Sequence, residues 1–488
     1  MNTANLLQRA ITLVRGCVVS IGLAPWAVYS APSQSYSLYG ESSLTDSCPV
    51  CGRVDIVRTM RGTFELRLLS ESLSESVYAV ENMTFETLDG LYHATLQGTL
   101  RVLRAEGSGQ EWALEGDIVD PEGSTACIIA ETGKLSEREL PVIRVKLEQT
   151  NGTISRQYLL TIDAAPFAGL WFSTGNGFTP DSGDGYVTGG SLLSSNGFVV
   201  RSNAELLAAF DPAQQNPEPG LDALDVLPGG IVAFSLNDDF ESQSLGLLRH
   251  GDLLLDDGRV LRRNSELLAA FVLQPSVDEH GLDAVQILSD GEILFSLTTD
   301  AFSEQLGTVL GHGSLLSDQG RIVRTNSQLL ERFHPSGPAQ DYGLDAAFQW
   351  PHGEIWFSLT GGFQDNQLGA IWAGDLLSDR GYIVVRGLDL VSPFRPIEDL
   401  ADFQTDALFL YGVQQPTASG RFLSIKADRP AGTIALEWTG GGQVFQLFRS
   451  PALEGPYLPL SLPGPERSFL DADSLALQPE AFYRLRQW

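Results

Sequence analysis

The sequence predicts an all-β protein made of several domains, and three observations lead to this prediction. The chain holds 50 glycines and 25 prolines, which favours many turns and few long helices. Short runs that alternate apolar and polar residues fill much of its N-terminal third. A unit of about 61 residues then occurs four times in the middle. At 488 residues the chain exceeds one ordinary domain, so we expect two to four.

The net charge of the chain limits the classes of molecule that we expect it to bind. The formal net charge is -30 at pH 7. Such a surface repels phosphate backbones and anionic lipid headgroups, so we expect neither nucleic-acid nor membrane-surface binding. Cations, Ca²⁺ above all, are the small partners that this charge favours. The alternative is that the charge only keeps the protein soluble.

The first segment has the pattern of a secretory signal peptide over residues 1–31. Arg9 and Arg15 precede an apolar stretch over 16–29, which is too short to span a bilayer and contains Pro25. Small residues follow at Ser30 and Ala31. We therefore expect a secreted, periplasmic or cell-surface protein. Since no later apolar run reaches membrane length, we expect no membrane span.

Residues 32–45 are rich in Ser, Tyr and Gly and indicate a linker. From 46 to 165 the pattern is that of strands separated by turn residues. Six runs show it best, at 62–69, 78–85, 91–103, 112–118, 141–147 and 157–162. This region is predicted to form a β-sandwich or an open barrel of about six to eight strands.

The repeats are identified by landmarks that recur in steps of about 61 residues. A Phe-Ser pair begins at Phe172, Phe234, Phe295 and Phe357. A G-[DS]-L-L turn begins at Gly190, Gly251, Gly313 and Gly374, and a phenylalanine ends each unit at Phe210, Phe271, Phe333 and Phe394. A constant step across unrelated landmarks indicates duplication.

One unit can be interpreted strand by strand. The segments 221–227 and 231–236 flank a Pro-Gly-Gly turn and predict a hairpin; a polar loop follows. The segments 252–255 and 259–262 flank a second glycine turn and predict a second hairpin. Asn264, like Asn203 and Asn326, precedes a Leu-Leu run and is predicted to cap a short helix. Four strands repeated four times favour a four-bladed β-propeller over residues 166–412.

The two ends of the array support closure. The array starts at a second strand, 170–173, and finishes with a lone first strand, 406–411. Pairing of these two segments would complete the first blade and leave no open sheet edge.

Two segments resemble known families. Asp345-Ala346-Ala347-Phe348 followed by Gly353-Glu354-Ile355-Trp356-Phe357 resembles a blade of hemopexin-type four-bladed propellers. The repeats also resemble those of uncharacterised exported bacterial proteins. After a linker at 413–420, residues 421–488 resemble a fibronectin type III-like module through Leu436-Glu437-Trp438, Phe445–Ser450, Asp471 and the ending 481–485. This resemblance implies a sandwich with Trp438 in its core.

Cys48-Pro49-Val50-Cys51 forms a C-x-x-C motif, and Cys127 is the third cysteine outside the signal segment. A disulfide from Cys127 to Cys48 or Cys51 is the favoured interpretation for an exported protein. A zinc site formed with His93 would supply four ligands. A redox pair would need a helix start to lower a thiol pKa, which this proline-rich context does not favour.

Four aspartates occupy the same position in successive units: Asp222, Asp283, Asp345 and Asp406. In a closed propeller the first strand of each blade lines the central channel, so these carboxylates could ring one axis and hold Ca²⁺. The resemblance to hemopexin-type channels implies a cation there as well. The alternative, which we weight more heavily, is that each Asp bonds backbone amides at a strand entry.

The remaining candidates favour binding over catalysis. His250 and His312 are repeat equivalents, and no motif pairs a histidine with a nucleophile. Trp350, Trp356 and Trp372 could stack on sugars, although such residues are more often core. We expect an exported non-enzymatic protein that presents propeller loops to a glycan or surface protein. The alternatives are a secreted glycan-acting enzyme and a structural cell-envelope component.

Overall fold

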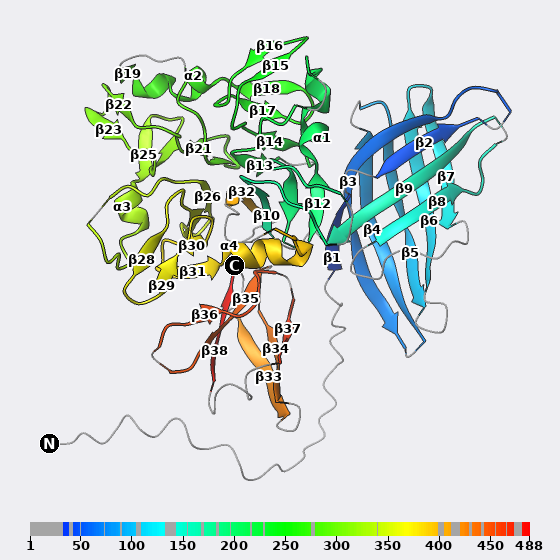
Figure 1. Cartoon of the computed structure of the whole chain (residues 1–488). Coiled ribbons are helices and arrows are strands. Elements are labelled where there is room, and N and C mark those ends of the chain that lie inside the picture. Colours follow the sequence, from blue (N-terminus) through cyan, green and yellow to red (C-terminus); the bar gives the residue numbers. More distant parts are fainter. Residues whose placement is uncertain are drawn as a thin grey trace. The chain divides into compact units, whose positions relative to one another are not determined.

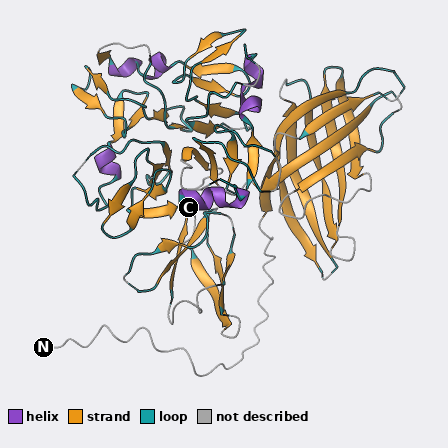
Figure 2. Cartoon of the chain, in the orientation of Figure 1, coloured by secondary structure: helices purple, strands orange, loops and turns teal. Residues whose placement is uncertain are grey.

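In the protein, described by a computed structural model, strands far outnumber helices (Figures 1 and 2), so the all-β prediction is confirmed. The description covers residues 33–488 apart from short gaps. Outside it lie residues 1–32, 39–41, 49, 73, 88–89, 104–108, 132–142, 154, 167–169, 182–184, 196, 215–216, 228–229, 275–278, 339, 399–404, 411–419, 429–431, 441–443, 454, 465 and 473–480. The expected signal peptide and nearly all of the 413–420 linker therefore lie outside the described residues.

The N-terminal region is one nine-stranded antiparallel sheet that closes on itself. Its strands are β1 (Ser33–Leu38), β2 (Ser43–Ser47), β3 (Ile56–Glu71), β4 (Glu75–Thr87), β5 (His93–Leu103), β6 (Gly109–Asp120), β7 (Gly123–Glu131), β8 (Ile143–Gln149) and β9 (Gln157–Pro166). Neighbours run from β3 through β2, β9, β8, β7, β6, β5 and β4 back to β3. β1 joins the same gap as β2, because it too pairs with both β3 and β9.

This ring-like sheet corrects two expectations. The segment 32–45 was expected to be a linker, but it contributes β1 and the start of β2. The region 46–165 was expected to form a β-sandwich or an open barrel, and it forms a single sheet that closes on itself around one core, which includes Phe64, Leu100 and Trp112. Closure requires strands to coil tightly. At Gly116 a Cβ atom would lie 2.0 Å from the Thr95 carbonyl oxygen, so only glycine fits there.

The repeats form four separate four-stranded antiparallel sheets, here called repeat sheets 1 to 4. Sheet 1 contains β12 (Phe198–Arg201), β11 (Leu192–Ser194), β10 (Leu170–Thr174) and β32 (Thr405–Leu410). Sheet 2 contains β13 (Leu224–Val226), β14 (Val232–Phe234), β17 (Leu253–Leu255) and β18 (Arg259–Arg262). Sheet 3 contains β20 (Val285–Ile287), β21 (Ile293–Phe295), β24 (Leu315–Ser317) and β25 (Arg321–Arg324). Sheet 4 contains β26 (Ala346–Gln349), β27 (Ile355–Ser358), β30 (Leu376–Ser378) and β31 (Tyr382–Val385).

The first strands of the four sheets contact one another in a cycle, β32 to β13 to β20 to β26 and back to β32. The last strand of the array, β32, pairs with β10, as the sequence predicted. The chain thus completes its first repeat sheet with residues from the far end of the array.

The segment expected to be a polar loop forms an additional hairpin. The hairpin strands are β15 (Phe240–Ser242) with β16 (Gly246–Leu248), β22 (Ala301–Ser303) with β23 (Thr308–Leu310), and β28 (Phe363–Asp365) with β29 (Gly369–Ile371). The middle hairpin gains an edge strand, β19 (Leu273–Gln274). The sequence predicted a loop here because one face of each hairpin is exposed and the segment therefore contains polar residues.

Each repeat ends in a short helix, namely α1 (Asn203–Leu207) with η1 (Ala208–Phe210), α2 (Asn264–Leu267) with η2 (Ala269–Phe271), α3 (Asn326–Leu329), and α4 (Gly387–Val391) with η3 (Ser392–Phe394). The predicted N-caps are wrong by one residue: Ser202 and Thr325 cap α1 and α3. Asn264 is instead a buried first helical residue, and its amide nitrogen lies 3.3 Å from the Gly281 oxygen at the start of the next repeat. It therefore links neighbouring repeats.

The recurring Phe and Ser landmarks also link successive repeats. The terminal rings of Phe210, Phe271 and Phe333 pack edge-on against the Phe of the following Phe-Ser pair, at 6.2, 6.4 and 6.4 Å between centroids. The hydroxyl of Ser235 donates to the Leu282 carbonyl oxygen at 2.9 Å, again in the next repeat. These Phe and Ser landmarks thus hold neighbouring repeats together.

The C-terminal region contains two three-stranded sheets. One contains β33 (Arg421–Asp428), β34 (Thr433–Thr439) and β37 (Ser468–Asp471), and the other contains β36 (Leu458–Pro459), β35 (Phe445–Ser450) and β38 (Phe482–Gln487). Their shared core includes Leu436, Leu447 and the buried Trp438, the residue that the sequence placed in a core.

Candidate functional site

The four repeat-equivalent aspartates lie at the first strands of the four repeat sheets. Asp222, Asp283 and Asp345 come just before or at the start of β13, β20 and β26, and Asp406 lies in β32. Because these strands contact one another in a cycle, the fold brings the four carboxylates, here called the central aspartates, into one region.

Burial and mutual repulsion disfavour ionisation of the central aspartates. Burial, and then the negative charges of Asp283, Asp345 and Asp406, raise the pKa of Asp222 well above its ordinary value. Burial, followed by the charge of Asp283, raises the pKa of Asp406 to about 7. The structure thus gathers acidic groups that repel one another.

Three of these carboxylates form hydrogen bonds with side chains. Asp283 hydrogen-bonds with Thr298, Asp345 with Ser358, and Asp406 with Asn237. One oxygen of Asp345, Oδ2, is buried without a hydrogen bond among the described residues. Within the described ranges, no three His, Cys, Asp or Glu side chains form a group that could hold a metal ion. The central cation therefore stays a prediction.

Two histidines lie beside this cluster, on turns that connect the outer hairpins to the third strand of each repeat sheet. These entry turns span 188–191, 249–252, 311–314 and 372–375. Nδ1 of His250 lies 3.0 Å from Asp239 Oδ1, and Nδ1 of His312 lies 2.8 Å from Asp300 Oδ1. Burial raises the pKa of Asp283 to about 7, while Thr298 and both histidines act in the opposite direction. Sequence equivalence identified this histidine pair but not its carboxylate partners.

The three candidate tryptophans have two different environments. Trp350 and Trp356 are fully buried and pack with their ring centroids 4.9 Å apart, so both are core residues. Trp372 is 65% exposed and lies in the fourth entry turn, where its backbone nitrogen donates to Asp375 Oδ2. It corresponds to Arg249 in repeat sheet 2. One exposed aromatic ring therefore belongs to the same set of turns as His250 and His312.

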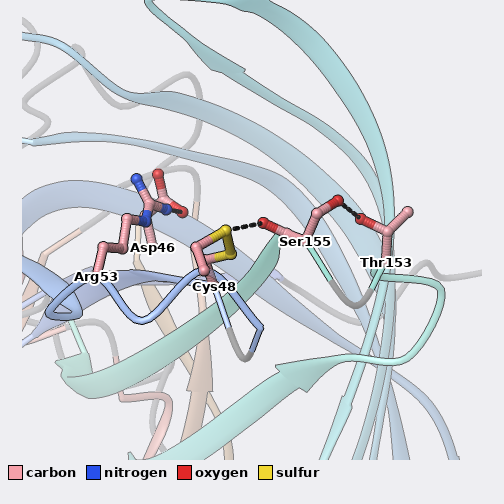
Figure 3. The surroundings of a disulfide bond; sticks show 6 residues. Asp46, Cys48, Arg53, Thr153 and Ser155 are labelled. Carbon is pink, nitrogen blue, oxygen red and sulfur yellow. Dashed lines mark hydrogen bonds and ion pairs between the residues drawn. A yellow bond between two sulfur atoms is a disulfide. The ribbon is translucent and has the colours of Figure 1, made fainter.

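The cysteines do not form the disulfide that the sequence favoured. Cys48 and Cys51 form a disulfide with each other, and Cys127 is free and buried, so the predicted bond of Cys127 to either residue is wrong (Figure 3). Cys127 lies in β7 within the core of the ring-like sheet, whereas the C-x-x-C motif lies in the turn between β2 and β3. Burial raises the pKa of the Cys127 thiol to about 11, which disfavours the thiolate that a metal or a disulfide exchange needs.

Sequence analysis missed a polar cluster beside this disulfide. Arg156 contacts Asp46 Oδ2 at 2.9 Å and Asp120 Oδ2 at 2.8 Å. Arg53 also pairs with Asp46, as Figure 3 shows. Tyr158 donates its hydroxyl to Asp120 at 2.5 Å. The residues come from four places in the chain, and no local spacing connects them. Tyr92 and Glu122 extend the cluster, at 3.0 Å from Asp46 Oδ2 and 2.9 Å from Arg156, and this dense mutual pairing indicates a structural role.

Among the described residues, every helix falls short of the length and apolar character that a bilayer crossing requires.

Comparison with known proteins places the chain in no family. No family model matches it, and no curated protein matches it. Solved structures with a detectable likeness include the “extracellular domain of the putative one component system” of B. thetaiotaomicron, with 8% identity, a TM-score of 0.18, and coverage of 90% of this chain and 94% of that chain. Another is the “extracellular domain of the putative hybrid two component system” of the same organism, with 9% identity, a TM-score of 0.21, and coverage of 91% and 82%. At these TM-scores the likeness carries no argument about fold or function.

Proposed function

We propose that this chain is an exported, non-enzymatic binding protein. In this proposal the four repeat sheets are the blades of a four-bladed β-propeller, and the C-terminal sheets form a fibronectin type III-like spacer. Support for the propeller comes from the cyclic contacts of the four first strands and from the pairing of β32 with β10. Support for export comes from the pattern of residues 1–31.

The ligand of this proposal is a glycan, and the observation that carries it is the exposed ring of Trp372. An indole face that is open to water gives an apolar platform on which a sugar ring can stack. In this proposal the entry turns of repeat sheets 2 and 3 add carboxylate and imidazole groups through His250–Asp239 and His312–Asp300, which can hydrogen-bond sugar hydroxyls.

A glycan array probed with the chain lacking residues 1–31 tests the proposal. Trp372→Ala is expected to weaken binding at least about tenfold, because a stacked aromatic ring is a typical hot spot. The matched control is Leu470→Ala, which removes an exposed apolar side chain from the C-terminal region. Equal binding by Trp372→Ala and the wild type would remove this function.

The alternative of a glycan-acting enzyme is favoured by one observation, the two histidine–aspartate pairs. A carboxylate that accepts from Nδ1 leaves Nε2 available to exchange a proton. Release of reducing ends from a bound glycan that disappears in His250→Ala/His312→Ala would support the enzyme. A structural envelope component would instead self-assemble without any glycan.

A further inference from the structure

The turn between β2 and β3 carries the one disulfide of the described residues. It joins Cys48, which follows directly after β2, to Cys51, only three positions later in the chain. In the chain-entropy description, a disulfide stabilises a fold by constraining the unfolded chain, and this constraint grows with the length of the closed loop. A bond across so short a loop constrains the unfolded chain little, so it contributes little to holding the ring-like sheet together.

Other interactions already close this turn at its base. The guanidinium of Arg53 pairs with the carboxylate of Asp46, so an ion pair joins a residue before Cys48 to a residue after Cys51. The ladder between β2 and β3 begins at the same place, with Asp46 opposite Ile56. The two cysteines are thus kept close together without their covalent bond. The bond can therefore break and form again while the sheet stays folded.

The two cysteines differ in their access to solvent. Cys51 is exposed, as are Val50 and Val54 nearby in the chain, at 60% and 86%. The Sγ atom of Cys51 lies 3.8 Å from the Ser155 carbonyl oxygen, in an exposed environment (Figure 3). Cys48, by contrast, is only 4% exposed. A thiolate from solution can therefore reach the sulfur of Cys51, and the sulfur of Cys48 becomes the leaving group.

The proline-rich context of the C-x-x-C motif disfavours an attacking thiol of low pKa in this chain. A disulfide that is attacked from outside has no such requirement, because the rate then depends on the attacking thiolate, on access and on the leaving group. Cys127 is not a second attacking group. It is buried in β7, and burial raises the pKa of its thiol to about 11.

We propose that the Cys48–Cys51 disulfide is a thiol–disulfide exchange site that a dithiol reduces, and not a structural cross-link. One thiolate of the dithiol attacks Cys51 Sγ, the bond between the two cysteines breaks, and Cys48 leaves as a thiolate that takes up a proton. The second thiolate of the dithiol attacks the sulfur of its own partner in this mixed disulfide and releases Cys51. The dithiol ends as a disulfide, and the two protons that it loses equal the two that the cysteines gain. Because this site lies in the ring-like sheet, the proposal goes beyond glycan binding.

Reduction of the folded protein tests the proposal, with the chain lacking residues 1–31 and dithiothreitol as the dithiol. Free thiols are alkylated at successive times and located by mass spectrometry, with and without urea. We expect Cys48 and Cys51 to be reduced in the folded chain at a rate within about tenfold of the rate in urea, because attack on Cys51 needs no unfolding. Cys127 is the internal control, since it should be alkylated only in urea.

Two results would overturn the proposal. One is reduction in the folded chain that is about a thousandfold slower than in urea, because the bond would then open only when the sheet unfolds. The other is rapid alkylation of Cys127 without urea in Cys48→Ser/Cys51→Ser, which would show that the disulfide holds the sheet together. The proposal expects Cys127 to stay protected in this variant.

A second arm distinguishes a protein dithiol from a small one. A thioredoxin in which serine replaces the second active-site cysteine cannot complete the exchange, so it stays bound as the mixed disulfide. Its capture on the wild type, and its loss in Cys51→Ser, would identify a protein as the reductant. Rapid reduction by dithiothreitol without capture would identify a small dithiol.

Discussion

The ring-like sheet and the repeat sheets both bury carboxylates, but they neutralise them differently. In the ring-like sheet, Asp46 and Asp120 are paired with Arg156. Burial acts to raise the pKa of Asp120, yet hydrogen bonds from Tyr158 and the Glu122 amide, with the charge of Arg156, bring it below its ordinary value. At the repeat centre, burial and like charges raise the pKa of Asp222 instead. The same side chain is an ion-pair partner in one region and a proton acceptor in the other.

The two regions therefore depend differently on solution conditions. The ring-like sheet carries its own counter-charge, and Asp120, whose pKa is lowered, stabilises it while it is ionised. The centre of the repeats needs a proton or a cation from solution to offset repulsion.

Removing the positive charge of Arg156 should cause the largest loss of stability. Arg156→Met leaves Asp46 and Asp120 buried near each other with less positive charge, and should cost about 3–5 kcal/mol of unfolding free energy. Urea unfolding measures it. Arg101→Met is the matched control, because Arg101 pairs with Glu75 and Glu111 at the surface, where solvent weakens ion pairs, and its loss should lower the unfolding free energy far less. Equal effects of the two variants would contradict the comparison.

The stability of the repeat centre should depend on pH in the direction set by the raised pKa values. The ordinary pKa of Asp283 is 3.8 and its folded value is about 7, so the folded state binds the proton more tightly. The resulting stabilisation is complete below pH 4 and is lost as the pH rises through 7. Asp283→Asn, which stays neutral, should be more stable than the wild type at pH 8 by about 1–3 kcal/mol.

Urea midpoints at pH 5, 6, 7 and 8 in a chelator measure this dependence. Asp300→Asn is the control, because Asp300 is exposed and a hydrogen bond from His312 lowers its pKa. A wild-type profile parallel to that of Asp283→Asn would show that Asp283 is not a proton acceptor in this range.

Adding Ca²⁺ should cause the smallest change in stability. If Ca²⁺ can replace the protons, it should raise the melting temperature at pH 8 by about 2–4 °C, which corresponds to about 1 kcal/mol for a domain of this size. At pH 5 the rise should shrink, because the central aspartates are then protonated. Superimposed melting curves with Ca²⁺ and with chelator at pH 8 would remove the central-cation hypothesis.

Local patterns in the sequence were sufficient to predict much of the secondary structure of the repeat region. The glycine turns at Gly197, Gly258, Gly320 and Gly381 adopt positive φ, and each lies between the third and fourth strands of a repeat sheet. The pairing of β32 with β10 followed from counting strands at the two ends of the array. These features are local or periodic, so a single sequence reveals them.

The all-β class, the four copies and the equivalence of the central aspartates could be predicted from the amino-acid order alone. Closure of the N-terminal sheet, the Cys48–Cys51 bond, and the exposure of Trp372 with the burial of Trp350 became apparent only in the folded chain. The physical reason is the range of the forces involved. Backbone preferences and apolar alternation act between near neighbours, whereas burial, ion pairing and pKa depend on residues such as Arg156 and Asp46 that lie far apart in the chain.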